Sequence, residues 1–203
     1  MSEEQHEILD KTVVYDGFFR LVRYRVNHRR YDGNWTGPIL REVFERGHAA
    51  AVLPYDPVQN QVLLIEQFRT AAIGSAVGPR LIEVIAGVIG QGETAEQVAR
   101  REAKEEAGLD LADLVPIYQV FASPGGSSER VSLFCARFDS RNAGGIHGLA
   151  EEQEDIRALI MSADQAGVEL GRTIVTAPAA MCIQWLLLKR AWLRAHWGVS
   201  GEG

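Results

Sequence analysis

The chain has 203 residues, of which 46% are hydrophobic and 24% are charged, and its formal net charge is −6. These values are ordinary for a globular protein and exclude a disordered chain, which would be less apolar and more unbalanced in charge. The acidic balance argues against a general nucleic-acid binder, which usually presents a basic face. An anionic small substrate stays possible, because bound divalent cations can invert the local field.

Nothing in the chain predicts export or a membrane partner. The N-terminal segment MSEEQHEILD is acidic and lacks the apolar core of a signal peptide. The longest apolar stretch, residues 181–188, is far shorter than the ~20 residues that a membrane span needs. Cys135 and Cys182 each lie in an apolar run and are expected to be buried thiols in a reducing compartment. We therefore expect a cytoplasmic protein with no membrane or nucleic-acid partner.

The first 45 or so residues predict a small antiparallel sheet. Residues 1–11 are expected to fray, and residues 12–28 read as extended around a break at Asp16-Gly17. Asp32-Gly33 marks a turn, after which residues 36–45 read as a strand. Because so small a sheet is marginally stable alone, it should pack on the main domain or on another subunit. We expect an N-terminal sheet segment over residues 1–47 and a main domain over residues 48–203.

The main domain predicts strands interleaved with helices, hence an α/β protein with a mixed sheet between helical layers. Thr94 and Gln97 fit a capping box at the start of a helix, and Gly108 stands where that helix should end. The glycine-rich and then acidic residues 139–153 predict a long loop. The expected strands cover 49–55, 60–68, 81–86, 115–122, 129–138 and 155–161, and the expected helices cover 94–107, a short segment from Ser162, and 178–197.

The helix over residues 94–107 places acidic side chains on its apolar stripe. At about 100° per residue, Glu102 and Glu106 project among the alanines of the helix rather than among its arginines. Carboxylates that point inward are costly unless they are compensated. A hard divalent cation would compensate them, and Mg²⁺ or Mn²⁺ is the natural candidate.

The same helix carries a motif that spans 23 residues. From Gly87 through Glu93 to REAKEEAGL at 101–109, the spacing resembles the Nudix box, G-x5-E-x7-R-E-U-x-E-E-x-G-U. Ala103 at the bulky aliphatic position is the one soft spot. The resemblance implies an α/β/α sandwich and a hydrolase that acts on nucleoside diphosphates linked to another moiety, with Mg²⁺ bound at the box.

Segments outside the box resemble the bacterial ADP-ribose pyrophosphatase subfamily, and the resemblance covers roughly residues 12–195. Pro124 stands 16 residues after Gly108, as in that group. The resemblance implies Mg²⁺-dependent hydrolysis of ADP-ribose to AMP and ribose 5-phosphate by a homodimer that exchanges its N-terminal sheets. Another nucleotide sugar such as GDP-mannose is an alternative substrate, and a non-catalytic nucleotide-binding module is a second alternative. The resembling segments are REVFERGHAAAVLPYDP (41–57), LIEQFRTAA (64–72), SPGGSSER (123–130) and GIHGLAEEQEDI (145–156).

The resemblance also assigns roles to single residues. Two or three Mg²⁺ ions would be held by Glu102, Glu106, Glu154 and the carbonyl of Ala86, with Glu105 joining the cluster. Arg101 would orient Glu105, and Glu93 would hold the loop near the helix. Glu152 would be the general base. If the alignment of this loop is shifted by one position, Glu151 or Asp155 would take the role of Glu152 or Glu154. Phe18 and Phe19 would stack on adenine from the partner subunit. The other expected substrate contacts are Arg41, Glu42, Arg46, Arg69, Val88, Ser123, Pro124, Gly125 and Glu129.

Taken without the resemblance, several of these features have ordinary explanations. The acidic run 151–155 would be a solvated mobile loop, and Phe18 and Phe19 would be strand core. Catalysis favours another reading of the loop, because metal-bound box glutamates leave no free carboxylate to act as base. A loop that closes on the substrate can bring one in.

Overall fold

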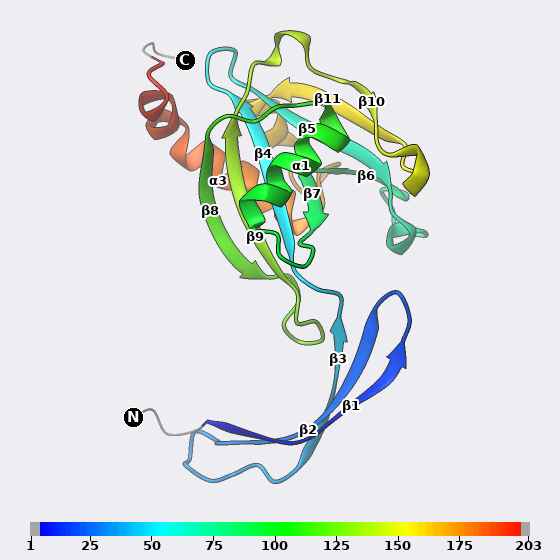
Figure 1. Ribbon diagram of the computed structural model, residues 1–203. Helices are drawn as coiled ribbons and strands as arrows, with labels where there is room; N and C mark the ends of the chain where they lie inside the picture. The colour runs from blue at the N-terminus through cyan, green and yellow to red at the C-terminus, as the bar shows by residue number, and fades with distance from the viewer. Residues whose placement is uncertain (1–4, 200–203) are drawn as a thin grey trace. The chain divides into compact units, whose positions relative to one another are not determined.

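The computed structural model describes residues 5–199, and the chain divides into two compact units (Figure 1). One unit contains the residues up to His48 together with Phe121–Arg130, and the other contains Ala49–Val120 and the residues from Val131 onward. Residues 1–4 of the segment expected to fray lie outside the described residues.

The smaller unit is built on a three-stranded antiparallel sheet in the order β1-β2-β3. β1 begins at His6, so the expectation of fraying up to residue 11 is wrong for the described part of that segment. The reason is pairing: His6 lies opposite His28 and Lys11 opposite Tyr24, and partners so far along the chain leave no local pattern. The strands are β1(His6–Asp16), β2(Arg20–His28) and β3(Ile39–Glu45).

The larger unit contains an eight-stranded mixed sheet. Its main path runs β10-β11-β5-β4-β9-β8, while β6 pairs with β5 and β7 pairs with β4. β4 and β9 are parallel, and β4 is antiparallel to β5 and β7. The strands are β4(Ala49–Asp56), β5(Gln61–Phe68), β6(Arg80–Glu83), β7(Ile85–Val88), β8(Leu114–Phe121), β9(Arg130–Arg137), β10(Gly145–His147) and β11(Ile156–Ser162).

Helices cover both faces of this sheet, so the expected α/β/α sandwich is confirmed (Figure 1). The helix α1(Ala95–Ala107) packs on one face, where Val52 and Ile65 form an apolar core with the alanines of the helix. The helices α2(Ala163–Glu169) and α3(Ala177–His196) pack on the other face. Cys135 and Cys182 are both buried there as free thiols, as expected. In the described part of the chain, no helix is long and apolar enough to cross a membrane.

Two expectations about the larger unit are corrected. The apolar run 81–86 is two strands, β6 and β7, because the chain switches neighbours at Val84 from β5 to β4. The segment 139–153 is not all loop, since residues 145–147 form β10 against β11. That strand has only three residues, one of them a glycine, and its pairing partner lies beyond the acidic run, so no local periodicity marks it.

Candidate active site

The helix α1 starts and ends where its sequence dictates. Thr94 Oγ1 accepts the backbone N–H of Gln97 at 3.2 Å, and Gln97 Oε1 accepts the N–H of Thr94 at 2.8 Å. Gly108 ends the helix in the left-handed conformation, with φ of 67°. This confirms the expected capping box. Fixed ends set the rotation of the helix, and that rotation decides which carboxylates face the sheet.

Glu106 and Glu102 point inward, as the helical pattern predicts. Glu106 is only 3% exposed, and its Oε2 accepts the backbone N–H of Ala86 at 3.1 Å. Burial raises the pKa of Glu106 to about 8 and also raises the pKa of Glu102. At Gly87 a Cβ atom would stand 1.6 Å from Glu102 Oε1, so only glycine leaves room for this carboxylate.

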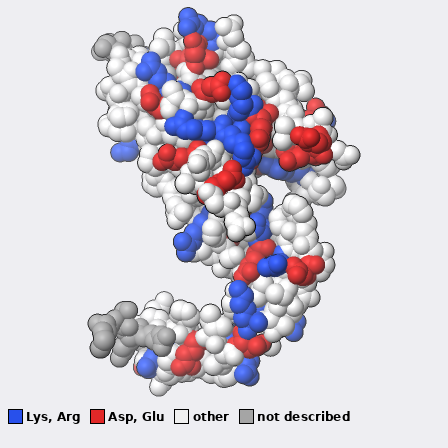
Figure 2. Space-filling model, viewed as in Figure 1, with Lys and Arg blue, Asp and Glu red and all other residues white. Residues whose placement is uncertain are grey.

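Arg101 pairs with three carboxylates of the box. Its Nε donates to Glu93 at 3.1 Å, and its Nη1 donates to Glu102 at 2.8 Å and to Glu105 at 2.9 Å. Burial alone would lower the pKa of Arg101, but the bond to Glu93 and the charges of Glu102 and Glu105 raise it. Glu93 also accepts the N–H of Gly90 at 2.9 Å, which ties the preceding loop to the helix. Figure 2 shows basic and acidic side chains intermixed over the larger unit.

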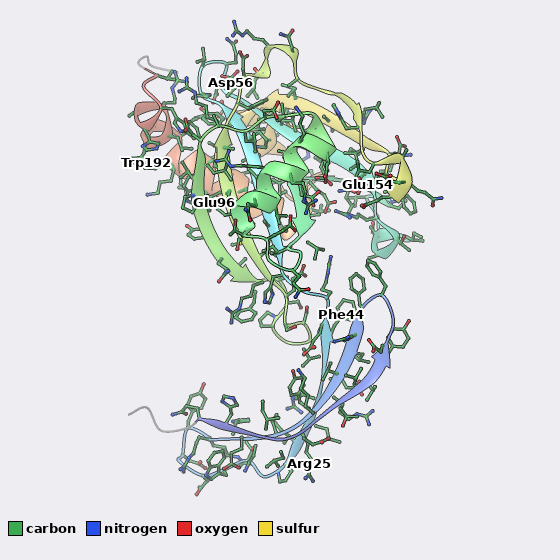
Figure 3. All side chains as sticks on the ribbon, viewed as in Figure 1. Arg25, Phe44, Asp56, Glu96, Glu154 and Trp192 are labelled. Atoms are coloured by element: carbon green, nitrogen blue, oxygen red, sulfur yellow. The ribbon has the colours of Figure 1, made fainter. Side chains whose placement is uncertain are left out.

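The acidic loop is anchored on both sides of a short 3-10 turn, η3(Ala150–Glu152). Before the turn, the N–H of Gly148 donates to the carbonyl of Glu105 at 3.2 Å. After it, Glu154 Oε2 accepts the N–H of Leu149 at 3.2 Å (Figure 3). The charge of Glu154 raises the pKa of both Glu102 and Glu106, so the three carboxylates interact through their charges. We call Glu102, Glu106 and Glu154 the carboxylate cluster. Glu152 is exposed on the turn itself.

The donor chemistry of this cluster fits a divalent cation. Glu106 is a buried carboxylate and Glu102 a partly buried one, and hard oxygen donors of this kind are what Mg²⁺ prefers. Within residues 5–199, no three His, Cys, Asp or Glu side chains already stand together in the arrangement of a metal site. The guanidinium of Arg101 is the positive charge that contacts Glu102 and Glu105.

A second polar group lies on β6, on β5 and just after the end of β5. Arg69 Nε donates to Glu83 Oε2 at 2.7 Å, and its positive charge lowers the pKa of Glu106. The sequence predicted Arg69 but missed Glu83 and the neighbouring Gln67, which is 7% exposed. A signal was available, because Gln67 has the same strand parity as Leu63 and Ile65, whose side chains belong to the core.

The smaller unit brings together the predicted aromatic and ribose-binding residues. The ring of Phe19 lies 4.7 Å from that of Phe18 and 5.1 Å from that of Phe44, which the sequence did not single out. The guanidinium of Arg46 lies 5.2 Å from the Phe19 ring, and its Nε is 3.6 Å from Glu129 Oε1. Phe18 is 94% exposed rather than strand core.

The remaining predicted residues are spread over both units. Arg41 donates to the carbonyl of Leu40 at 2.8 Å, and Glu42 accepts from Arg23 at 3.1 Å. Both side chains therefore have a hydrogen-bond partner within the N-terminal sheet. Ser123 accepts the N–H of Gly126 at 3.1 Å in the turn that contains Pro124 and Gly125, all of which are exposed. In the larger unit, Val88 ends β7 and is 44% exposed.

Comparisons with known proteins agree with this picture. A family model described as NUDIX domain matches residues 45–181. The chain is 47% identical over 193 residues to a protein of Escherichia coli (strain K12) named ADP-ribose pyrophosphatase, covering 94% of this chain and 92% of that one. It is 33% identical over 170 residues to a Shigella flexneri protein named GDP-mannose pyrophosphatase, covering 82% and 85%. A solved structure of an ADP compounds hydrolase matches with a TM-score of 0.69 at 18% identity, over 98% of this chain and 100% of that one, and so shares the fold.

Proposed function

Because this chain belongs to the Nudix family, we propose that it hydrolyses the diphosphate of ADP-ribose to AMP and ribose 5-phosphate. The observation that carries the proposal is the near full-length identity of 47% to a relative named ADP-ribose pyrophosphatase, against 33% to one named for GDP-mannose. A match confined to the box would support the chemistry but not the substrate. The intact box disfavours a module that binds nucleotides without cleaving them.

Nudix hydrolases generally use divalent metal ions, and we propose two or three Mg²⁺ ions, which Mn²⁺ can replace. The ligands would be the carboxylates of Glu102, Glu105, Glu106 and Glu154 and the carbonyl of Ala86. When bound, such ions neutralise phosphate oxygens and lower the pKa of water. The buried carboxylate of Glu106, whose pKa is raised to about 8, supports this assignment, because a cation removes the cost of its charge.

The proton transfer falls to the acidic loop in this proposal. Glu152 takes the proton of the attacking water, as an exposed carboxylate on a turn between the anchors at Gly148 and Glu154. Arg101 holds Glu105 through the contact at 2.9 Å and so keeps that carboxylate directed at the cluster.

Substrate recognition divides between charge and stacking. Arg69 binds the diphosphate, since a guanidinium matches phosphate oxygens, and Val88 packs near it. Phe18 and Phe19 stack on adenine, a use that suits the 94% exposure of Phe18. The other proposed contacts to the ribose and phosphate groups are Arg41, Glu42, Arg46, Ser123, Pro124, Gly125 and Glu129.

We also propose a cytoplasmic homodimer that exchanges its N-terminal sheets. Every residue of β1 is exposed, including Ile8 at 56%, Val13 at 48% and Tyr15 at 63%. Apolar side chains gathered on one strand in this way mark an interaction surface. Light scattering coupled to gel filtration tests the oligomeric state. A mass near twice 22.4 kDa supports the dimer, and a mass of 22.4 kDa contradicts it.

A substrate panel tests the function. Initial rates with Mg²⁺ are measured for ADP-ribose, GDP-mannose, ADP-glucose, NADH and diadenosine polyphosphates, and the products are separated by chromatography. The proposal predicts the highest kcat/KM for ADP-ribose. Preference for another nucleotide sugar would keep the box chemistry and overturn the substrate assignment, and absence of all turnover would favour the binding module.

A further inference from the structure

Gln67 is a buried polar residue of the larger unit. Its side chain is 93% buried, given its exposed fraction of 7%, and among the described residues its Nε2 has no hydrogen-bond partner. Native proteins rarely bury an amide donor without an acceptor, because the lost hydration is not compensated. An acceptor from outside the chain, either a water molecule or a ligand oxygen, would satisfy this donor.

The register of the sheet shows where this amide lies. Side chains alternate along a strand, and Leu63 and Ile65 belong to the core beneath α1, so Gln67 lies on the α1 face as well. Arg69 continues the extended backbone with φ of −123° and ψ of 109°, and its N–H donates to the carbonyl of Pro79 at 2.7 Å. Arg69 therefore follows Gln67 on the same face, which is also the face of the Glu106 carboxylate.

The ion pair between Arg69 and Glu83 spans the position of Gln67. Glu83 lies opposite Ile65 and Leu81 lies opposite Gln67 in the β5–β6 ladder. A contact of 2.7 Å from Arg69 to Glu83 must therefore run diagonally across the Gln67–Leu81 pair. Glu83 binds Arg69 through Nε, so the four other N–H groups of the guanidinium lie on its Nη atoms. Arg69 stays 43% exposed in its side chain, while Glu83 is only 16% exposed.

We infer that Gln67, Arg69 and Glu83 form one anion subsite for the diphosphate, in which Gln67 and Arg69 donate to phosphate oxygens and Glu83 positions Arg69. This inference rests on the proposed function but assigns two residues that it does not include. A guanidinium fixed at Nε presents its Nη edge in one orientation, which favours paired contacts to phosphate oxygens. The buried amide of Gln67 supplies a neutral donor beside it, which the ligand then satisfies.

The test uses four variants in the full-length protein. Gln67→Met keeps the volume and removes the donor, and Glu83→Ala removes the anchor of Arg69. Glu83→Gln keeps an oxygen that can accept from Nε and should restore most binding. Arg69→Ala provides the background for a double-mutant cycle. The matched control is Glu66→Ala on the same strand, since Glu66 contacts Arg157 at 2.8 Å from the opposite face.

Binding of ADP-ribose is measured by calorimetry in EDTA, and KM and kcat are measured with Mg²⁺. We expect Gln67→Met and Glu83→Ala each to raise Kd and KM about tenfold while kcat changes less than threefold, with Glu66→Ala unchanged. Glu83→Ala should add nothing in the Arg69→Ala background. A merely structural role would give the same effect in both backgrounds and would overturn the inference, as would an unchanged Kd in Gln67→Met.

Failure of the proposed function would look different. If the wild-type protein neither binds nor cleaves ADP-ribose, the substrate assignment fails, and inorganic pyrophosphate becomes the probe of the subsite. Weaker binding of pyrophosphate to Gln67→Met and Glu83→Ala than to the wild type would still support the inference. Equal binding to the wild type and both variants, or no binding to the wild type, would overturn it.

Discussion

Glu106 Oε2 accepts the backbone N–H of Ala86 at 3.1 Å, and this single bond joins helix α1 to strand β7 of the sheet. The peptide unit at Ala86 thereby has two uses in the proposed mechanism, because its N–H orients Glu106 and its carbonyl is a proposed metal ligand. Helix α1 and strand β7 must keep their relative position for both to operate, and their close packing around Ile85 and Ala103 favours this.

Glu106→Gln should reduce kcat with ADP-ribose on the order of 10³-fold, because it removes a charge from the carboxylates that we propose as cation ligands. The fold should survive, since the amide oxygen can still accept from Ala86. Steady-state kinetics and a thermal melt check this. Glu96→Gln on the exposed start of the same helix is the control and should behave as wild type. Nearly full activity in Glu106→Gln would remove the basis of the metal assignment.

The stability of the metal-free protein should fall as pH rises from about 5 to about 8. Burial raises the pKa of Glu106 from 4.5 to about 8, so the folded state holds its proton more tightly than the unfolded state. The stabilisation is therefore complete below the unfolded pKa and is lost as pH passes through the folded one, on the order of a few kcal/mol. Urea unfolding in EDTA measures it, and Glu106→Gln should flatten the curve. A wild-type curve that rises over this range relative to the variant would contradict the prediction.

Gly148→Ala should lower kcat about tenfold or more. Gly148 has φ of +104°, and a Cβ atom there would stand 2.8 Å from Glu154 Cβ, so the proposed ligand must move. Gly171→Ala is the matched control, because Gly171 also has positive φ but an added Cβ would meet nothing within 4 Å. Both variants should lose about 1 kcal/mol of stability. Equal kcat values in the two variants would show that the position of Glu154 does not matter to turnover.

Asp56→Ala should destabilise the fold by about 2–4 kcal/mol without changing KM. Burial would raise the pKa of Asp56, but bonds from Ser140, Gln59 and Val58 outweigh it and lower that pKa. A lowered pKa gives stability that is present above about pH 4 and lost as pH falls. Chemical unfolding at pH 7 and pH 3.5 checks this, because the difference between wild type and variant should shrink at the lower pH. A constant difference would contradict it.

The inward carboxylates could be predicted because a helix has one period, and the capping residues at Thr94 and Gly108 fixed its phase. The burial of Gln67 could also be predicted, from its strand parity with Leu63 and Ile65. The ion pair of Glu83 with Arg69 could not, since it depends on β6 lying beside β5. The same limit explains why one apolar run became β6 and β7, and why β10 was expected as loop. The pairing of strands depends on contacts between segments far apart in the sequence, while the faces of a helix follow from its local sequence.

The products released from ADP-ribose show whether this protein is an ADP-ribose pyrophosphatase. Wild-type protein with Mg²⁺ should release AMP and ribose 5-phosphate in equal amounts, at a higher kcat/KM than it shows for GDP-mannose, and Glu106→Gln should release almost none. Intact ADP-ribose after prolonged incubation, or faster cleavage of GDP-mannose, would contradict the account.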